Sequence, residues 1–344
     1  MALSPPVNPH ADVRVSYSPN GRQTYAAYDD GEGDILFVIS HNDGSTWQPP
    51  RTILSAYIDT YGYLHTFTVE AMATPRTAEN ASRIYLAIAE RIRQDDDEYS
   101  SVHTPIILYT SSNGGKTWTR GPELCWSGYD DWVDIHCDLR LAGGLNGDVV
   151  AFYATYDGGG ETEGTFAILA SRDFGATFTT VREVKDMALW QNIGDIAIGP
   201  KGTAHLVYRG PLPGNGDVLY EWSAPPYTKW AAPVRLNDDP VEATQGLPVL
   251  AVQNCGERGV VHVAWPDDRI TPERHNIFYT RKVASQGFAW SPNLRISQAV
   301  VWKGRFAASG TQIAAGGGSA FVLWDAPGSD GVLGSRVMHG VSCP

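Results

Sequence analysis

An eight-residue pattern that recurs three times limits the possible folds of this chain more than any other feature. It reads Ser-x-Asp/Asn-x-Gly-x-Thr-aromatic, and its copies are residues 40–47, 111–118 and 171–178. In each copy the Asp or Asn side chain can bond the amides of its own turn, and the Gly supplies a positive φ angle. Each copy follows an apolar run and precedes a shorter one, as in a β-hairpin. Three copies of one turn predict a repeated β unit.

Two weaker copies extend the repeat toward the C-terminus. Residues 223–230 keep the serine and the tryptophan, and residues 284–290 keep a glycine and the closing tryptophan. The closing aromatic residues stand at positions 47, 118, 178, 230 and 290, which is a period of roughly sixty residues. This period fits a four-stranded blade with long loops.

Taking each pattern as the turn between a third and a fourth strand divides the chain into six four-stranded antiparallel blades. The strands expected in the first blade are residues 13–18, 24–28, 34–40 and 51–54. The last blade has only three strand patterns, whereas residues 3–8 are left over at the N-terminal end. We expect residues 3–8 to complete the last blade, because this closure removes two exposed sheet edges at once. The predicted fold is an all-β, six-bladed β-propeller in a single domain, residues 1–344.

The composition excludes two classes of partner. A net charge of −12 argues against nucleic-acid binding, which needs clustered Lys and Arg. No apolar run approaches the eighteen or so residues of a membrane span, so we expect a soluble protein. We also expect a monomer. The first residues lack the pattern of a signal peptide, but a signal removed by processing leaves no trace. We expect an extracellular or secreted protein.

Four cysteines are present, and none lies in a Cys-x-x-Cys pair. Cys125 and Cys137 flank one loop, and we predict a disulfide between them. Cys255 and Cys343 could pin the last repeat. Free buried thiols are the alternative for all four. The chain has no zinc-type His/Cys spacing and no phosphate-cradling glycine loop, so no metal or cofactor is expected.

The repeated pattern resembles the Asp boxes of sialidases and their relatives, which are six-bladed propellers. The resemblance covers the whole chain as architecture and is specific for the turn motif. Asp boxes also occur in other hydrolases, in lyases and in lectins. The fold therefore does not assign a function, and the site has to be argued separately.

The resemblance also implies an arginine clamp for an acidic sugar. Sialidases hold the substrate carboxylate with three arginines, because a guanidinium group matches a carboxylate in a bidentate way. The corresponding positions are Arg14 on the first inner strand and Arg209 and Arg269 at the ends of second strands, with Arg305 as a fourth at the start of the last blade. Arg269 has a structural alternative, because Trp-x-Asp-x-Arg is common in Asp-box propellers. Residues 302–309 hold no tyrosine, so the sialidase nucleophile is missing and an orthodox sialidase is not expected.

Other candidate residues come from the starts of the inner strands and from the loops between blades. A carboxyl group among apolar neighbours has a raised pKa and suits a general acid, although a carboxylate bonded to loop amides is the alternative for each position. The catalytic candidates are Glu70, Asp134, His136 and Asp195. Aromatic faces stack on sugar rings, and the polar groups of such loops bind hydroxyls. The further substrate-binding candidates are Tyr63, His65, Trp132 and Trp190.

These features predict a glycan-directed propeller with one central site, which we expect to be an exo-acting glycoside hydrolase on an acidic or deoxy sugar. One alternative is a polysaccharide lyase, in which His136 or His65 would work with a tyrosine as base and acid. The other is a non-catalytic lectin, which would repeat one aromatic and polar pocket in every blade. The connecting loops differ from blade to blade, which favours a single central site.

Overall fold

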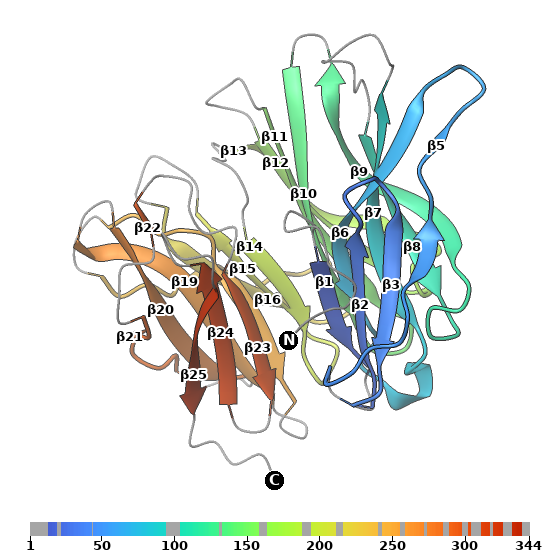
Figure 1. Ribbon diagram of the computed structural model, residues 1–344. Helices are drawn as coiled ribbons and strands as arrows, with labels where there is room; N and C mark the ends of the chain where they lie inside the picture. The colour runs from blue at the N-terminus through green and yellow to red at the C-terminus, as the bar shows by residue number, and fades with distance from the viewer. Residues whose placement is uncertain are drawn as a thin grey trace. The chain divides into compact units, whose positions relative to one another are not determined.

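The computed structural model resolves the chain into two compact units built from β-strands (Figure 1). It describes residues 13–18, 22–42, 44–93, 104–130, 133–157, 164–187, 194–210, 216–239, 243–254, 259–271, 274–284, 289–297, 302–303, 311–316, 319–325 and 332–338. Unit 1 is residues 1–186, and unit 2 is residues 187–344. Within these ranges one 3₁₀ turn, η1 (Ala78–Asn80), accompanies the strands, and no helix is long and apolar enough to cross a membrane. The all-β class predicted from the sequence is confirmed.

The first sheet of unit 1 has the four strands that the sequence predicts. They are β1 (Val13–Tyr17), β2 (Thr24–Asp29), β3 (Ile35–Ser40) and β4 (Arg51–Leu54). The strands pair antiparallel in this order. β2 is buried along its whole length, because alternate side chains pack into two different apolar clusters, one on each face of the sheet.

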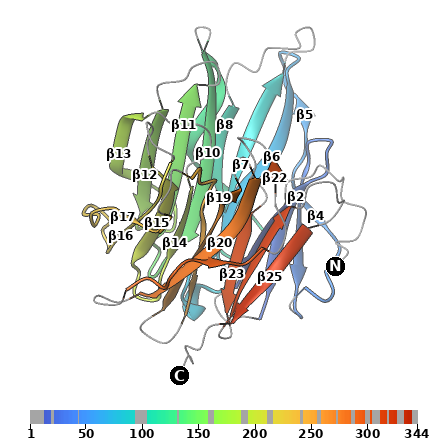
Figure 2. The same cartoon turned by 90° about the vertical axis from the view of Figure 1, so that its left-hand side faces the viewer.

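The second and third blades of the prediction are joined into one nine-stranded sheet. Its strands are β5 (Tyr57–Ile58), β6 (Leu64–Ala73), β7 (Ile84–Arg93), β8 (Thr104–Ser111), β9 (Thr119–Asp130), β10 (Val133–Gly143), β11 (Val149–Asp157), β12 (Gly164–Ser171) and β13 (Thr179–Met187). They pair in chain order, and Figure 2 shows β10 to β13 side by side.

The separation of the second and third blades that the sequence predicts is therefore not observed at this point in the chain. The residues that were expected to form a loop between two blades instead extend β9 and β10 into a hairpin, in which Val133 pairs with Asp130. Only two residues, 131 and 132, lie between the two strands. Antiparallel strands separated by so few residues can keep the hydrogen-bond ladder between them, whereas separate blades would require this ladder to end.

The three strong copies of the turn pattern share one hydrogen-bonding scheme. In the first, Gly44 N donates to Ser40 Oγ at 2.8 Å and Thr46 N donates to Asn42 Oδ1 at 2.8 Å. The second and third copies repeat these two bonds at 2.9 to 3.0 Å. The turns connect β3 to β4, β8 to β9 and β12 to β13, so their prediction as turns between third and fourth strands is confirmed.

The strands that were predicted as the first strands of successive blades pack against one another in unit 1, where β6 contacts both β1 and β10. β6 carries a β-bulge, because Val69 pairs with Ile88 and Ala71 pairs with Ala87, which leaves Glu70 as the extra residue. Val69 therefore packs into the cluster shared with the first sheet, whereas Ala71 packs into the cluster shared with β10. Bulges of this kind re-aim side chains and are frequent beside active sites.

The described residues of unit 2 form three sheets. The first holds β14 (Gly194–Ile198), β15 (Ala204–Arg209), β16 (Val218–Ser223) and β17 (Val234–Arg235). The second holds β18 (Val249–Gln253), β19 (Val260–Thr271), β20 (Arg274–Val283) and β21 (Leu294–Arg295), and the third holds β23 (Gln312–Gly316), β24 (Ser319–Asp325) and β25 (Val332–Met338). The first strands β14, β18 and β23 again pack in succession.

Two features of unit 2 bear on the predicted last blade. The short strand β22 (Trp302–Lys303) pairs with β20, so these two residues extend the second sheet of the unit rather than begin the last one. The reason is that the ladder of β20 continues beyond its pairing with β21 and offers a free edge. Residues 3–8, which were expected to complete the last sheet, lie outside the described residues.

Candidate functional site

Two of the predicted site residues meet on the first strands of unit 1. Arg14, on β1, donates from Nε to the backbone carbonyl oxygen of Glu70 at 2.8 Å. Glu70 occupies the bulge of β6, is partly exposed, and accepts a hydrogen bond from Thr68 Oγ1 at 3.3 Å. A guanidinium group is thus held beside a carboxyl-bearing residue that the bulge turns out of the regular strand alternation.

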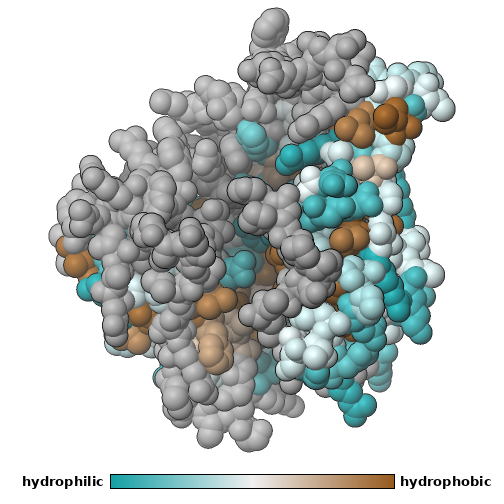
Figure 3. Space-filling view, viewed as in Figure 1, coloured by the Kyte–Doolittle hydropathy of each residue, from teal (hydrophilic) through white to brown (hydrophobic). Residues whose placement is uncertain are grey.

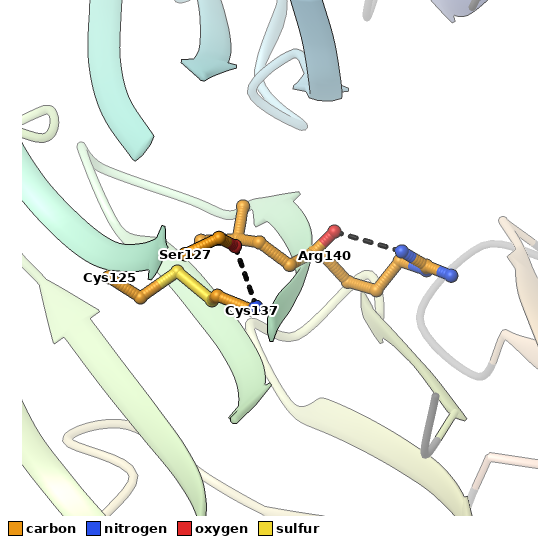
Figure 4. Close-up of a disulfide and its surroundings, with 5 residues drawn as sticks. Cys125, Ser127, Cys137 and Arg140 are labelled. Atoms are coloured by element: carbon orange, nitrogen blue, oxygen red, sulfur yellow. Dashed lines mark hydrogen bonds between the residues drawn. A yellow bond between two sulfur atoms is a disulfide. The ribbon is translucent and has the colours of Figure 1, made fainter. Parts of the chain in front are cut away.

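The hairpin of β9 and β10 carries two further candidates, and a disulfide crosslinks it. Cys125 and Cys137 are bonded, as predicted, and Cys137 N donates to Ser127 Oγ at 2.8 Å (Figure 4). His136 is next to this crosslink and is half-buried, in register with Tyr156 of β11. The backbone of Asp134 lies on β10 opposite Tyr129, but its side chain lies outside the described part of the structure, as does all of Trp132.

His65 stands at the start of β6 between two carboxylates. Its Nδ1 is 2.9 Å from Glu90 Oε1, and its Nε2 is 3.5 Å from Asp59 Oδ2. Asp59 Oδ1 also accepts hydrogen bonds from the amides of Tyr61 and Tyr63, which shapes the loop between β5 and β6. The structure therefore brings the two predicted residues Tyr63 and His65 together around Asp59.

Glu90 is a member of this group that was not identified from the sequence. It accepts from His65 and from Tyr57 OH, and its Oε2 lies 3.7 Å from Arg120 Nη2. A usable signal was present, because Ile84, Leu86 and Ile88 form one buried face of β7 and Glu90 is the next residue on that face. A carboxylate at the end of an apolar row needs polar partners.

Asp195, in unit 2, has contacts that indicate a structural role. Its Oδ1 accepts from the amide of Ile196 at 2.8 Å, and its Oδ2 accepts from the amide of Leu250 at 3.0 Å. The bond from Leu250 fastens β14 to β18. The alternative of a carboxylate bonded to backbone amides is therefore the one that the geometry favours for this residue.

Arg269 is surrounded by carboxylates of its own unit. Its Nη2 lies 2.7 Å from Asp267 Oδ2 and its Nη1 lies 2.6 Å from Asp238 Oδ1, with Asp239 at 3.5 Å. The guanidinium group also covers the ring of Phe278 at 4.1 Å. Burial alone would lower the pKa of Arg269, but the bonds to Asp267 outweigh burial and raise it. This charge balance favours the structural interpretation of Arg269.

Arg209 lies in the opposite charge environment. The two positions are similar, because Arg209 is the last residue of β15 and Arg269 lies near the end of β19. Within the described part of the chain no carboxylate pairs with Arg209, and its buried Nε has no hydrogen-bond partner. Gly216 packs against it so closely that a Cβ there would overlap the Nε. Burial lowers the pKa of Arg209. A cation held in this way, without an internal counter-charge, is suited to an external anion.

The remaining candidates, Trp190 and Arg305, lie outside the described residues. Arg14 belongs to unit 1, and Arg209 and Arg269 belong to unit 2, so the proposed clamp stays a prediction. Among the residues that the structure describes, no group of three His, Cys, Asp or Glu side chains is arranged to hold a metal ion.

Comparisons with known proteins identify the fold. No family model matches the chain, and no curated protein matches it in sequence. Three similar solved structures are an α-L-arabinofuranosidase from Fusarium graminearum, an intramolecular trans-sialidase from Ruminococcus gnavus, and the six-bladed β-propeller lectin of Aleuria aurantia. The TM-scores are 0.55, 0.51 and 0.52, and the identities are 15%, 12% and 13%. The matches cover 96%, 95% and 96% of this chain, and 95%, 94% and 92% of the other chains.

These likenesses extend over nearly the whole chain. The protein therefore shares the β-propeller fold of these structures. At such identities the likeness shows the fold, and the chemistry has to come from the site residues.

Proposed function

We propose that the protein is a carbohydrate-active enzyme, an exo-acting glycoside hydrolase that removes an acidic or deoxy sugar at one central site. The observation that carries the proposal is the meeting of Arg14 and Glu70 on adjacent first strands. First strands line the centre of a propeller, where a single substrate can be reached from several sheets.

Glu70 has the features of a reacting carboxylate. It is partly exposed, it is re-aimed by the β-bulge, and its Oε1 is held by Thr68. We propose that this carboxylate acts as the nucleophile or the general base. Asp134 and His136, from the adjacent strand β10, are proposed as the complementary acid or base.

Arg209 supports an acidic sugar as the substrate. A guanidinium group without an internal carboxylate is expected where an external carboxylate binds. In the described part of unit 2, Arg209 has this setting and Arg269 does not. The proposed clamp therefore relies on Arg209, together with Arg14 and Arg305, more than on Arg269.

Two observations bear on the alternatives. The arabinofuranosidase and the trans-sialidase are enzymes that act on sugars and share the fold of this chain, but the lectin shares it as well, so the fold does not decide between hydrolase and lectin. The lyase alternative requires a histidine that can accept a proton from the substrate. Both ring nitrogens of His65 face carboxylates at 2.9 and 3.5 Å, which makes His65 a poor base for that step.

A single central site also requires the sheets to close into a ring of six blades. We propose that residues 3–8 supply the fourth strand of the last sheet, of which three strands are described. Deletion of residues 1–9 is then expected to lower the melting temperature by several degrees, because two sheet edges become exposed. Melting at an unchanged temperature would argue against this closure.

The decisive experiment is an activity screen with a matched pair of variants. A panel of nitrophenyl glycosides of sialic acid, glucuronic acid, fucose and arabinofuranose, together with uronate polysaccharides, would be incubated with the protein. Glu70→Gln is expected to lower kcat at least about 100-fold on any substrate that is turned over. Glu79→Gln, an exposed glutamate of η1, should be close to wild type.

The outcomes separate the candidate functions. An unsaturated sugar product would indicate a lyase, and saturable binding without any product would indicate a lectin. Rescue of Glu70→Ala by azide, with a glycosyl azide as the product, would assign Glu70 as the nucleophile or the acid/base. Full activity of Glu70→Gln would reject the role proposed for this residue.

A further inference from the structure

The ring of Tyr57, on the hairpin of β5 and β6, is held as a flat surface with one side covered. It stacks on the imidazole of His65, with 4.3 Å between the ring centroids and 10° between the ring planes. His65 is 8% exposed, whereas Tyr57 is 46% exposed. Because His65 covers one face of the Tyr57 ring, the exposed area lies on its other face and edge.

Polar contacts fix the orientation of this ring. Tyr57 OH donates to Glu90 Oε1 at 3.3 Å, and the same oxygen lies 2.9 Å from His65 Nδ1. Tyr57 and His65 are also directly opposite each other in the β5–β6 ladder. The ring is therefore held through its backbone, its hydroxyl and its stacked face. A surface aromatic residue fixed in this way loses little side-chain entropy when a ligand covers it.

The groups beside the ring are suited to hydroxyl donors. The Asp59 side chain is 25% exposed and the Glu90 side chain is 14% exposed, and ionised carboxylates accept hydrogen bonds but do not donate them. An anionic ligand would be repelled by these two carboxylates. A neutral polyol can instead donate its hydroxyl hydrogens to them while its C–H face lies on the aromatic ring.

The apolar surface around Tyr57 is small. Ile58 and Tyr61 are exposed on the same hairpin. Figure 3 shows a small hydrophobic area in brown at the upper right of the view. Three side chains on one hairpin fall far short of the roughly 800 Å² that each partner buries in a stable protein interface. The size and chemistry of the surface therefore fit one sugar ring better than a protein partner.

We propose that Tyr57 is a stacking subsite for a neutral sugar residue, with Asp59 and Glu90 as hydroxyl acceptors at its edge. The inference rests on the proposed function in taking the ligand to be a glycan. His65 and Glu70 are five residues apart on β6, which is roughly 16 Å along a strand. One sugar ring does not span this length, so the subsite would bind a unit distant from the one at Glu70, and the protein would prefer oligosaccharides to monosaccharides.

The test measures binding and turnover separately. Isothermal titration with neutral gluco-, xylo- and manno-oligosaccharides of one to six units would give the dependence of Kd on chain length. Tyr57→Leu, which keeps apolar bulk but removes the flat ring, is expected to raise Kd about fivefold to tenfold for the longer oligosaccharides that bind. Tyr57→Phe keeps the ring and should bind within about twofold of wild type.

The failures of the two proposals are distinguishable. If Glu70→Gln binds the oligosaccharide but does not cleave it, and Tyr57→Leu still cleaves a short aryl glycoside with an unchanged kcat, both proposals stand. If no substrate is turned over but Tyr57→Leu still weakens binding, the hydrolase proposal alone fails. Equal affinity of wild type and Tyr57→Leu for every oligosaccharide, or no binding of any oligosaccharide by wild type, would overturn the subsite.

A protein partner would give a different result. Ile58→Ser should leave oligosaccharide binding and the oligomeric state unchanged, because Ile58 lies outside the proposed stacking face. A wild-type dimer in light scattering that Ile58→Ser converts to a monomer would overturn the proposal in favour of an interface between two copies.

Discussion

The carboxylate of Asp195 accepts a hydrogen bond from the backbone amide of Leu250 at 3.0 Å, across 55 residues of sequence. The bond ties β14 to β18, the first strands of two successive sheets in unit 2. A residue that looks catalytic by its position near the start of a strand thus holds two sheets together.

Replacement of Asp195 should therefore affect stability. Asp195→Ala removes the acceptor for two partly buried amides, and we expect the free energy of unfolding to fall by about 1–3 kcal/mol. Asp195→Asn keeps one side-chain oxygen and should lose less. Urea unfolding followed by tryptophan fluorescence would measure both. Unchanged stability together with lost turnover would return Asp195 to the catalytic candidates.

Arg269 offers a second prediction about stability. Arg269→Leu would leave the carboxylate of Asp267, which is 0% exposed, without its cation. Breaking a buried pair in this way costs about 3–5 kcal/mol. The stability of Arg269→Lys should lie between those of wild type and Arg269→Leu, because one ammonium group cannot reproduce the guanidinium fork that meets Asp267 and Asp238. Arg51→Leu, at an exposed position of β4, is the matched control and should change stability by less than about 0.5 kcal/mol.

Asp173 should make the stability of the folded protein depend on pH. Hydrogen bonds from the Thr177 side chain and amide, and from Ser171, lower the pKa of Asp173 to about 2. The pKa of Asp173 in the folded protein lies below its value of about 3.9 in the unfolded chain. The contribution of Asp173 to the free energy of unfolding is therefore complete above about pH 3.9 and is lost as the pH falls toward 2. The equivalent positions in the other two turns are Asn42 and Asn113, so Asp173→Asn should keep the turn without titrating.

Calorimetry at constant ionic strength would check this prediction. The melting temperature of wild type should fall relative to that of Asp173→Asn between pH 5 and pH 2, and the difference should be constant above pH 5. A difference that does not change over the acidic range would mean that the hydrogen bonds of the turn do not favour the charged form.

The disulfide between Cys125 and Cys137 gives the fourth prediction. It closes a loop with a sequence separation of 12, so its removal is expected to cost about 3 kcal/mol, mainly by freeing the unfolded chain. The double variant Cys125→Ser, Cys137→Ser should be less stable than wild type by this amount. A reducing agent should destabilise wild type but should leave the double variant unaffected. Equal stability of the two proteins would contradict the prediction.

The turns are features that the local sequence specifies. In the copy at 111–118, the bonds from Gly115 N to Ser111 Oγ and from Thr117 N to Asn113 Oδ1 join residues four positions apart. Such a turn is specified by its own residues, because no distant partner is needed to satisfy its polar groups. The strands on either side follow from the apolar alternation, and the prediction of the first sheet was confirmed strand by strand.

The site residues could be named from the sequence, but their surroundings could not. Arg209 and Arg269 occupy similar positions near the ends of second strands, and the motif around each gives no measure of charge balance. Asp238 reaches Arg269 from 31 residues away, whereas no described carboxylate pairs with Arg209. Which of two arginines is neutralised depends on loops from other strands.

The amino-acid sequence by itself determined the repeat, its turns, the β class and the Cys125–Cys137 pair, because these depend on side chains that act on nearby backbone or on a single short loop. Tertiary structure alone decided that β9 and β10 continue as one hairpin, that Glu90 and Asp59 enclose His65, and that Arg14 meets Glu70. Each of these depends on the pairing register of strands or on contacts between groups up to 56 residues apart. A one-residue change of register, such as the bulge at Glu70, turns the following side chains to the other face, and composition and spacing carry no record of that choice.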